Sequence, residues 1–501
     1  IFLTFILFFV ASPIILSFCK VKTKDSDTFN LSRFATKISA NKKRAREESF
    51  SNEIADVLTK TEITIEAQVG EEDKMFRSVT TLDIHKSLAS KKIKIERSAI
   101  LLEEPIKALG IYHVPVQVSS SLKVDVKIPL KYNAKEIYYR FIVNNNISPI
   151  GKTKTLPILN PDKFNLAFCS CSNYPAGFFN AYREIAINND IDLVLHLGDY
   201  LYEYGAGGYA TEDAIKLNRQ VDPVNEILSL EDYRKRHALY KTDDDLQLLH
   251  ASKPMIAVWD DHEFTNDSWK YGAENHQSEE GFFQSRKANA IKAYLEWMPI
   301  RENKSKLKIW RKFEVGNLFQ LLMLDTRSIY RDKQLNIEDY FDGNTINKPK
   351  YKRDLSIDRK LIGLEQMLWI KNNLNKKFKW SIIGQQVLMA QVYLPTIFAN
   401  MNKKILPDYL HKYLKIGGAN VPYNTDAWDG YPRERERLFN ELKQANSILV
   451  LTGDTHNSWL NNLYDESNNF IGVEIGAPAI SSPNTIDTFG SLTNGIEQGF
   501  I

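Results

Sequence analysis

Two apolar runs of this chain end in the same dipeptide, Gly-Asp, and this feature constrains the fold more than any other. Residues 194–204 read Val-Leu-His-Leu-Gly-Asp-Tyr-Leu-Tyr-Glu-Tyr, and residues 449–456 read Leu-Val-Leu-Thr-Gly-Asp-Thr-His. Short apolar runs rich in Val and Leu are typical of buried strands, and the carboxylate, phenol and imidazole groups that follow them are metal ligands. The pattern indicates one metal site built between two sheets.

A third apolar run supports this interpretation. Residues 254–259 read as another buried strand, which ends in Asp260-Asp261-His262-Glu263 and is followed by Asn266 and Asp267. A single Gly-Asp after a strand is usually a turn or a helix cap, and an acidic cluster is usually a solvated face. Three strand ends with one chemistry favour a shared pocket where the strands of an α/β sheet end.

Eight short motifs follow one another from residue 169 onward: Cys169–Tyr174, His196–Tyr204, Trp259–Glu263, Leu324–Arg327, Gly384–Val387, Trp428–Tyr431, Thr452–His456 and Ser481–Pro483. In this order they resemble alkaline phosphatase D, the PhoD-like branch of the calcineurin-like metallophosphoesterases. Any one of them is a weak signal, but eight in the family's order are a specific match that covers the chain from about residue 165 to its end. The resemblance implies hydrolysis of phosphate esters, as an alkaline phosphatase or phosphodiesterase, by water activated between two or more metals.

The resemblance also implies a first metal, Fe³⁺, held by Cys171, Asp199, Tyr202 and His456, with Asp199 bridging to a second metal. Thiolate, phenolate and imidazole suit a transition metal better than calcium. Taken alone, Tyr202 would more often be a packed aromatic residue and both cysteines small core residues. Its place in the motif favours Cys171 as the ligand and leaves Cys169 in the core.

The second metal position is expected to collect Asp199, Asp261 and Asp454, together with the amide oxygen of Gln386. An all-oxygen set suits Ca²⁺, with other divalent metals as alternatives. Gln385 is the alternative to Gln386, since one of the two amides is needed to satisfy backbone groups.

Two further side chains are candidates for contact with the phosphate group. His262 follows a metal ligand and would protonate the leaving group near neutral pH; its alternative role is to hold Asp260 or Asp261. Arg327 would clamp phosphate through its planar guanidinium group, or it forms a salt bridge with Asp325. His196 lies within an apolar strand and is expected to be a core histidine.

The chain is long enough for two domains, since it has 501 residues, of which 43% are apolar. From residue 165 onward, buried strands alternate with amphipathic helices, which predicts a layered α/β metallophosphoesterase sandwich over 158–501. The strands are expected at 165–168, 191–197, 255–259, 318–324, 380–383 and 447–451. An apolar run begins at 499–501, and we expect this domain to continue beyond it.

Alternating segments at 63–69, 122–129 and 136–143 predict a small immunoglobulin-like β-sandwich domain over 21–157, with an irregular leading segment. The region 84–100 is lysine-rich and fits this prediction poorly. Residues 1–20 read as an export signal, or as a membrane anchor. We therefore expect a periplasmic, cell-surface or extracellular protein whose contact with a membrane is confined to this segment.

The composition limits the classes of partner that the protein can bind. The formal net charge is only +3, and no basic stretch contains interleaved aromatic residues, which argues against a nucleic-acid groove. Three cysteines exclude a disulfide framework. Besides a phosphate monoester, the expected substrate is a phosphodiester such as a phospholipid, cleaved by a phospholipase D-like enzyme. The alternative from another class is a non-catalytic surface module braced by metals.

Overall fold

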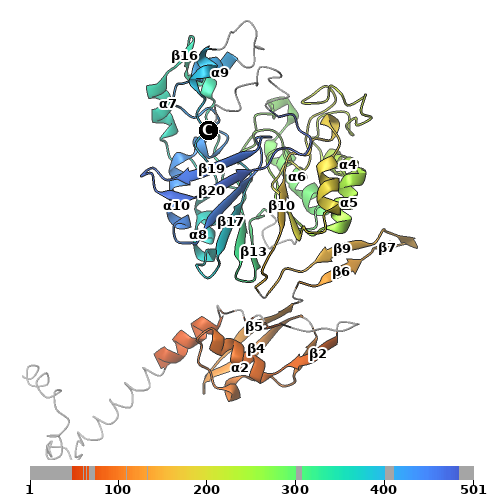
Figure 1. Ribbon diagram of the computed structural model, residues 1–501, viewed down its shortest axis with the longest axis vertical. Helices are drawn as coiled ribbons and strands as arrows, with labels where there is room; N and C mark the ends of the chain where they lie inside the picture. Colours follow the sequence, from red (N-terminus) through yellow and green to blue (C-terminus); the bar gives the residue numbers. More distant parts are fainter. Residues whose placement is uncertain are drawn as a thin grey trace, which may run out of the picture. The chain divides into compact units, whose positions relative to one another are not determined.

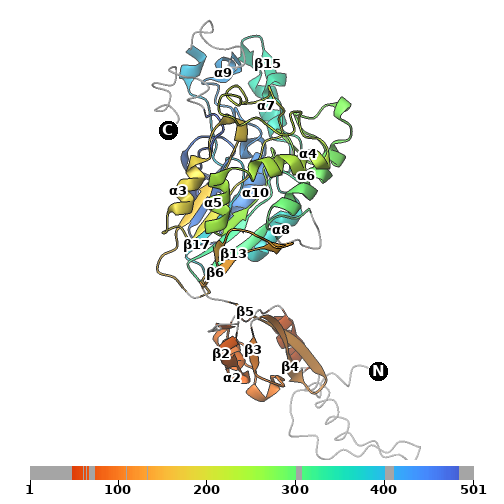
Figure 2. The ribbon, with the colours of Figure 1, turned by 90° about the vertical axis from the view of Figure 1, so that its right-hand side faces the viewer.

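The computed structural model describes residues 48–59, 61, 63, 65–66, 74–108, 110–131, 134–158, 160–300, 307–400 and 411–484 (Figures 1 and 2). It divides into two compact units, Ile1–Asn133 and Ala134–Ile501. The expected export signal or anchor (1–20), most of the leading segment and the apolar run at 499–501 lie outside the described residues. No helix in the described ranges is long and apolar enough to cross a membrane.

The first unit combines helices with two small sheets. Residues 48–59 are helical, and α2 (Thr81–Ser90) contributes the buried Ile84 and Leu88 to the core of the unit. One sheet has the order β1-β5-β4, in which β1 pairs parallel to β5 and β4 pairs antiparallel to it. The other pairs β2 with β3. The bounds are Ile65–Glu66 for β1, Lys74–Val79 for β2, Ile106–Ala108 for β3, Gly110–Ser119 for β4, Leu122–Lys131 for β5 and Arg97–Ala99 for the 3₁₀ helix η2.

The prediction of an immunoglobulin-like domain over 21–157 is therefore wrong. An immunoglobulin-like sandwich packs two antiparallel sheets, whereas this unit contains helices and a parallel strand pair. The segment 136–143, which the prediction counted as part of the sandwich, belongs to the second unit. The alternation at 122–129 was genuine, since this segment lies within β5, but the same alternation occurs in any antiparallel pair with one buried face.

The second unit is built on two sheets. Strands β10 (Leu166–Cys169), β11 (Leu193–His196) and β12 (Met255–Ala257) form a parallel three-stranded sheet. The other sheet has the order β13-β14-β17-β18-β20-β19, in which β14, β17, β18 and β20 run parallel and the two outer strands are antiparallel. Its strands span Arg311–Val315, Phe319–Met323, Trp380–Gly384, Ile448–Thr452, Phe470–Gly476 and Trp459–Tyr464, in the order just given. All six predicted strands of this domain are present, each within two residues of its expected ends.

Helices cover the outer faces of both sheets. One core includes residues of both sheets and of α3, α4, α5 and α6, while a second core packs α8 and α10 against the six-stranded sheet. Figure 1 shows these two groups of helices on opposite sides of the sheets. The layered α/β sandwich is thus confirmed. The helices are α3 (Asn180–Ile187), α4 (Leu230–Tyr240), α5 (Asp244–Ser252), α6 (Phe283–Trp297), α8 (Gly363–Asn373) and α10 (Pro432–Leu442).

Smaller elements surround this sandwich. The antiparallel pairs β6–β9, β7–β8 and β15–β16 and the helices α7 and α9 complete the regular structure of the second unit. Their bounds are Glu136–Tyr139 (β6), Ile142–Val143 (β7), Asn146–Ile147 (β8), Gly151–Lys154 (β9), Phe341–Asp342 (β15), Thr345–Ile346 (β16), Lys348–Leu355 (α7) and His411–Ile416 (α9), with 3₁₀ turns at Tyr174–Ala176, Ser278–Glu280, Ile337–Tyr340, Thr396–Asn400 and Trp428–Gly430.

The topology brings the polar strand ends together. Strands β10, β11 and β12 run parallel, as do β17 and β18, so within each sheet their carboxyl ends share one edge. A single parallel bridge between Ser170 and Ala479 connects the two sheets just beyond β10. The motifs that follow these strands therefore meet at the junction of the sheets.

Candidate metal centre

Four candidate ligands leave their strands in left-handed backbone conformations. The φ angles are 62° at Cys171, 53° at Asp199, 64° at Asp454 and 62° at His456. Positive φ is uncommon for residues other than glycine, costs about 1 kcal/mol or more, and clusters at functional sites. The packed strands hold these residues in turns that direct their side chains to one place.

All four expected ligands of the first metal meet around one carboxylate oxygen. The Sγ atom of Cys171 and the hydroxyl of Tyr202 each lie 3.3 Å from Oδ2 of Asp199. The same hydroxyl lies 3.1 Å from Nε2 of His456. Ligand atoms of Cys171, Asp199 and His456 lie within 4.8 Å of one another. One thiol, one phenol, one carboxylate and one imidazole are thus grouped, a donor set that suits a transition metal.

The imidazole of His456 is prepared to act as a ligand. Its Nδ1 lies 2.8 Å from the carbonyl oxygen of Pro483. A carbonyl only accepts hydrogen bonds, so Nδ1 carries the proton and the lone pair of Nε2 faces Tyr202. Burial lowers the pKa of His456 to about 4, which keeps the ring neutral near pH 7.

A second group of carboxylates lies next to the first. Oxygens of Asp260, Asp261 and Asp454 lie within 4.8 Å of one another, and ligand atoms of Asp199, Asp261 and His262 form another such group. Asp261 belongs to both of these groups. Asp199 belongs to the group with His262 and also to the group with Cys171 and His456. The structure therefore brings together three of the four residues expected at the second metal, Asp199, Asp261 and Asp454.

Arg327 lies among these carboxylates and forms ion pairs with four aspartates, none of which is the expected Asp325. Its Nη1 donates to Asp426 at 2.8 Å, its Nη2 lies 3.2 Å from Asp454 and 3.3 Å from Asp261, and its Nε donates to Asp260. Asp325 instead accepts the backbone N–H of Arg327. The guanidinium group is fully engaged, so it aligns the carboxylates and would clamp phosphate only after releasing one of them.

The centre carries excess negative charge. Arg327 and Arg331 contact Asp260, Asp261, Asp426 and Asp454, so two negative charges remain uncompensated if all four aspartates are ionised. Burial, followed by repulsion from neighbouring carboxylates, raises the pKa of Asp199 well above its ordinary value and that of Asp454 to about 7. Burial and Asp199 likewise raise the pKa of the Cys171 thiol. Bound cations would relieve this repulsion, so the donor set fits metals.

His262 is held by a glutamate that sequence reasoning did not assign. Its Nδ1 lies 2.7 Å from Oε2 of the fully buried Glu203, and its ring stacks on Tyr202 with centroids 4.1 Å apart. Burial opposes the imidazolium, but Glu203, Asp199 and Asp261 outweigh this effect and raise the pKa of His262 well above its ordinary value. Because Glu203 holds Nδ1, Nε2 is the ring nitrogen available to a substrate.

Glu263 is another residue of the motifs that had no predicted role. Its carboxylate accepts the backbone N–H groups of Asp199 at 3.0 Å, of Tyr200 at 2.7 Å and of Asp260 at 2.7 Å. The side chain is buried and ties the turn after β11 to the turn after β12. The only sequence signal for this role was its place directly after the acidic cluster.

Gln386, a predicted ligand of the second metal, is hydrogen-bonded to other protein groups. Its Oε1 accepts from the hydroxyl of Thr326 at 2.6 Å, and its Nε2 donates to the carbonyl groups of Trp259 and Leu324. It therefore braces the ends of β12, β14 and β17. Gln385 accepts from the indole N–H of the buried Trp428, so neither amide faces the carboxylates as a free oxygen ligand.

The two residues expected in the core are there. The Sγ atom of Cys169 is buried and faces the carbonyl of Leu195. His196 is fully buried, with Nε2 2.8 Å from the hydroxyl of Tyr182 and Nδ1 accepting from Gly198.

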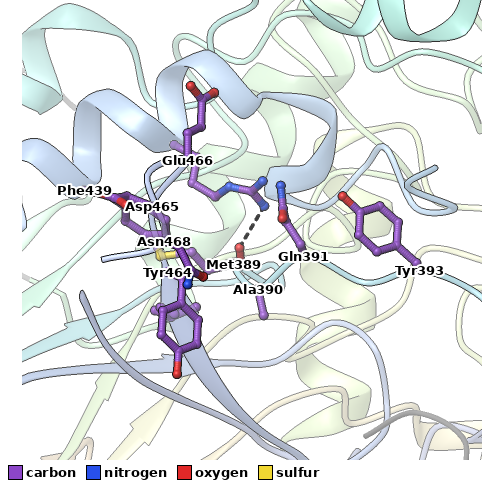
Figure 3. A pocket seen from close by; sticks show the side chains of 11 residues that line it. Met389, Ala390, Gln391, Tyr393, Phe439, Tyr464, Asp465, Glu466 and Asn468 are labelled. Atoms are coloured by element: carbon purple, nitrogen blue, oxygen red, sulfur yellow. Dashed lines mark hydrogen bonds between the residues drawn. The ribbon is translucent and has the colours of Figure 1, made fainter. Parts of the chain in front are cut away.

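A hollow of about 570 Å³ lies apart from these residues, beside α10 and the β19–β20 turn (Figure 3). Its lining includes Tyr393, Tyr464 and Arg435, and none of the candidate metal ligands. Arg435 is paired there with Asp429 at 2.7 Å, so its charge is already balanced.

Comparisons with known proteins match the two units of the chain to different families. The model of the PhoD-like phosphatase family matches residues 166–497. Alkaline phosphatase D of Bacillus subtilis (strain 168) is 37% identical over 361 residues, which are 70% of this chain and 56% of that protein. A solved structure described as "Structure of PhoD" superimposes with a TM-score of 0.57 at 35% identity, covering 72% of this chain and 65% of the other.

The first unit has different relatives. The model of the ribosomal protein L9 C-terminal domain matches residues 50–131. Large ribosomal subunit protein bL9 of Anaeromyxobacter dehalogenans (strain 2CP-C) is 37% identical over 93 residues, which are 19% of this chain and 62% of that protein. The chain spans less than two thirds of each of these relatives. The phosphatase match covers most of the chain and contains the whole candidate metal centre, and the protein accordingly belongs to the PhoD-like phosphatase family.

Proposed function

We propose that the second unit hydrolyses phosphate esters at the centre formed by Cys171, Asp199, Tyr202, Asp454 and His456. The observation that carries the proposal is the convergence of Cys171, Tyr202 and His456 on Asp199 from turns separated by more than 250 residues of sequence. Asp454 lies in the adjoining group with Asp260 and Asp261. A non-catalytic module would need no histidine held beside the ligands, whereas His262 is fixed there by Glu203.

The donor types support two kinds of metal. Thiolate, phenolate and imidazole favour Fe³⁺ at the first position, and the oxygens of Asp199, Asp261 and Asp454 favour Ca²⁺ or another divalent cation at the second. When bound, such metals neutralise charge on the phosphoryl oxygens and lower the pKa of water. Asp199 faces both donor sets, so it is the bridging candidate.

The remaining side chains orient the ligands or transfer protons. Glu203 holds Nδ1 of His262, so Nε2 is placed to protonate the oxygen of the departing alcohol. Arg327 aligns the aspartates, and Glu263 fixes the two turns that carry Asp199 and Asp260.

Metal analysis combined with a monoester and a diester assay tests this proposal. We expect iron and calcium in the purified protein, hydrolysis of p-nitrophenyl phosphate or bis(p-nitrophenyl) phosphate, and reversible loss of activity when a calcium-selective chelator removes calcium but not iron. Greater activity on the diester, or on a phospholipid, would favour the phospholipase D-like alternative. A metal-loaded protein that cleaves neither ester would favour the alternative of a non-catalytic surface module braced by metals.

The first unit supports a second candidate function, association with the large ribosomal subunit. The observation that favours it is the L9-like match over residues 50–131, together with the small α/β fold of that region. We expect the full chain to sediment with large subunits stripped of bL9 and to be displaced by added bL9. Absence of co-sedimentation would reject this function.

Export is the competing proposal for where the protein acts, and it rests on the apolar character of residues 1–18. Fractionation of expressing cells separates the two proposals, because an exported chain is recovered outside the cytoplasm and a ribosome-associated chain with the ribosomes.

A further inference from the structure

A second cavity in the phosphatase unit combines apolar walls with positive charge. It has a volume of about 320 Å³ and is lined by residues from α5, the beginning of β12, the end of α6 and β13. Met255, Ile256, Met298, Ile300 and Phe313 supply apolar surface, and Arg311 and His250 supply polar groups. None of the candidate metal ligands lines it.

Arg311 has no carboxylate partner in the described part of the chain. Its Nη2 donates to the carbonyl of Ala257, while its Nε is buried without a hydrogen-bond partner. Arg327, Arg331 and Arg435 each contact an aspartate. Among the described residues, Arg236 and Arg359 also lack a carboxylate partner, but each donates to three backbone carbonyl groups. Arg311 and Phe313 share one face of β13, and both line the cavity.

A second basic side chain, that of Lys241, lies directly behind the cavity wall. The Nζ atom of Lys241 lies 3.0 Å from Nε2 of His250 and 3.9 Å from Sδ of Met298, and it also donates to the hydroxyl of Tyr200. All of these partners are uncharged, since burial and Lys241 lower the pKa of His250 to about 3. Burial lowers the pKa of Lys241 itself to about 7.

Largely buried cations without a counter-ion are costly, because desolvation is not compensated by an ion pair. We propose that this cavity binds a small organic anion, whose charged head pairs with Arg311 and whose apolar tail contacts Met255, Met298 and Phe313. The volume accommodates a head group with a tail of several carbon atoms. The proposal does not depend on the reaction at the metal centre.

Octanoate is the probe that combines both features, and 1-octanol is its uncharged counterpart. Isothermal titration calorimetry on the full, metal-loaded chain should show one octanoate site and much weaker binding of octanol. Arg311→Met should weaken octanoate binding by at least about tenfold, the factor expected for one charge-assisted hydrogen bond. Lys241→Met should weaken it in the same direction.

Lys312→Met is the matched control. Lys312 follows Arg311 on the same strand, does not line the cavity and is paired with Glu314 at 2.8 Å. Its substitution should leave octanoate affinity unchanged. Thermal unfolding and metal content show whether each variant is folded, and Lys241→Met provides the test if Arg311→Met is not. No octanoate binding to the wild type, octanol binding equal to octanoate binding, or unchanged octanoate affinity in the folded variants would each overturn the proposal.

Discussion

Replacing Glu263 by glutamine should separate the stability of the fold from the geometry of the metal centre. One carboxylate oxygen accepts N–H groups of Asp199 and Asp260, and the other accepts that of Tyr200. Glutamine keeps one acceptor but turns the other into a donor, so at least one buried N–H loses its partner. Burial raises the pKa of Glu263 to about 8, so above this pH the remaining bonds also lose their charge assistance. Each buried unsatisfied N–H costs about 1–3 kcal/mol. We expect a total loss of about 2–4 kcal/mol of unfolding free energy.

Glu434 provides an equivalent carboxylate outside the centre. It is buried and accepts the N–H groups of Leu361 and Ile362 with one oxygen and that of Gly363 with the other. Glu434→Gln should therefore lose a similar unfolding free energy in a denaturant titration. Only Glu263→Gln should also bind metal about 10–100-fold more weakly, because its turns carry ligands. Equal metal affinity in the two folded variants would refute the claim that Glu263 positions the ligands.

Three further predictions concern single residues. Asp199→Asn should lower kcat about a hundredfold or more while leaving the circular dichroism spectrum unchanged, because it weakens the charge shared by two cations; wild-type turnover in the metal-loaded variant would exclude the bridging role. Cys171→Ser should lose iron and the visible thiolate-to-iron absorption, whereas Cys169→Ser should lose only about 1–2 kcal/mol of stability; spectra that respond to Cys169 instead would reverse the assignment. Lys241 has a pKa of about 7 in the folded chain, against an ordinary value of 10.5. Between these two values the unfolded chain holds one more proton than the folded chain, so the unfolding free energy should rise by about 1 kcal/mol per pH unit from pH 7 to 9. If Lys241→Met shows the same pH dependence of the unfolding free energy as the wild type in denaturant titrations, the prediction is contradicted.

The sequence predicted the phosphatase fold and most of its candidate site because both depend on local patterns. Short apolar runs specified the six strands, and the resemblance of the motifs that follow them to the family implied the ligands. Cys171, Asp199, Tyr202 and His456 meet as expected because parallel strands bring their carboxyl ends to the same edge.

Residues whose role depends on distant partners could not be predicted in this way. Glu263 and Glu203 act on turns and rings that other segments supply, and Gln386 is engaged by Thr326, 60 residues away in sequence. For the first unit, alternation indicated strands but not their sheet order. The helical spacing of Ile84 and Leu88 was obscured by lysines and other polar residues.

The left-handed backbone at Cys171, Asp199, Asp454 and His456 places the metal ligands but lowers the stability of the chain. Glycine would relieve the strain at each of these four positions, by about 1 kcal/mol, and would remove a ligand at the same time. Selection for thermal stability alone would therefore tend to accumulate glycine there. If evolved variants keep residues other than glycine at these four positions, selection has acted on turnover as well as on stability.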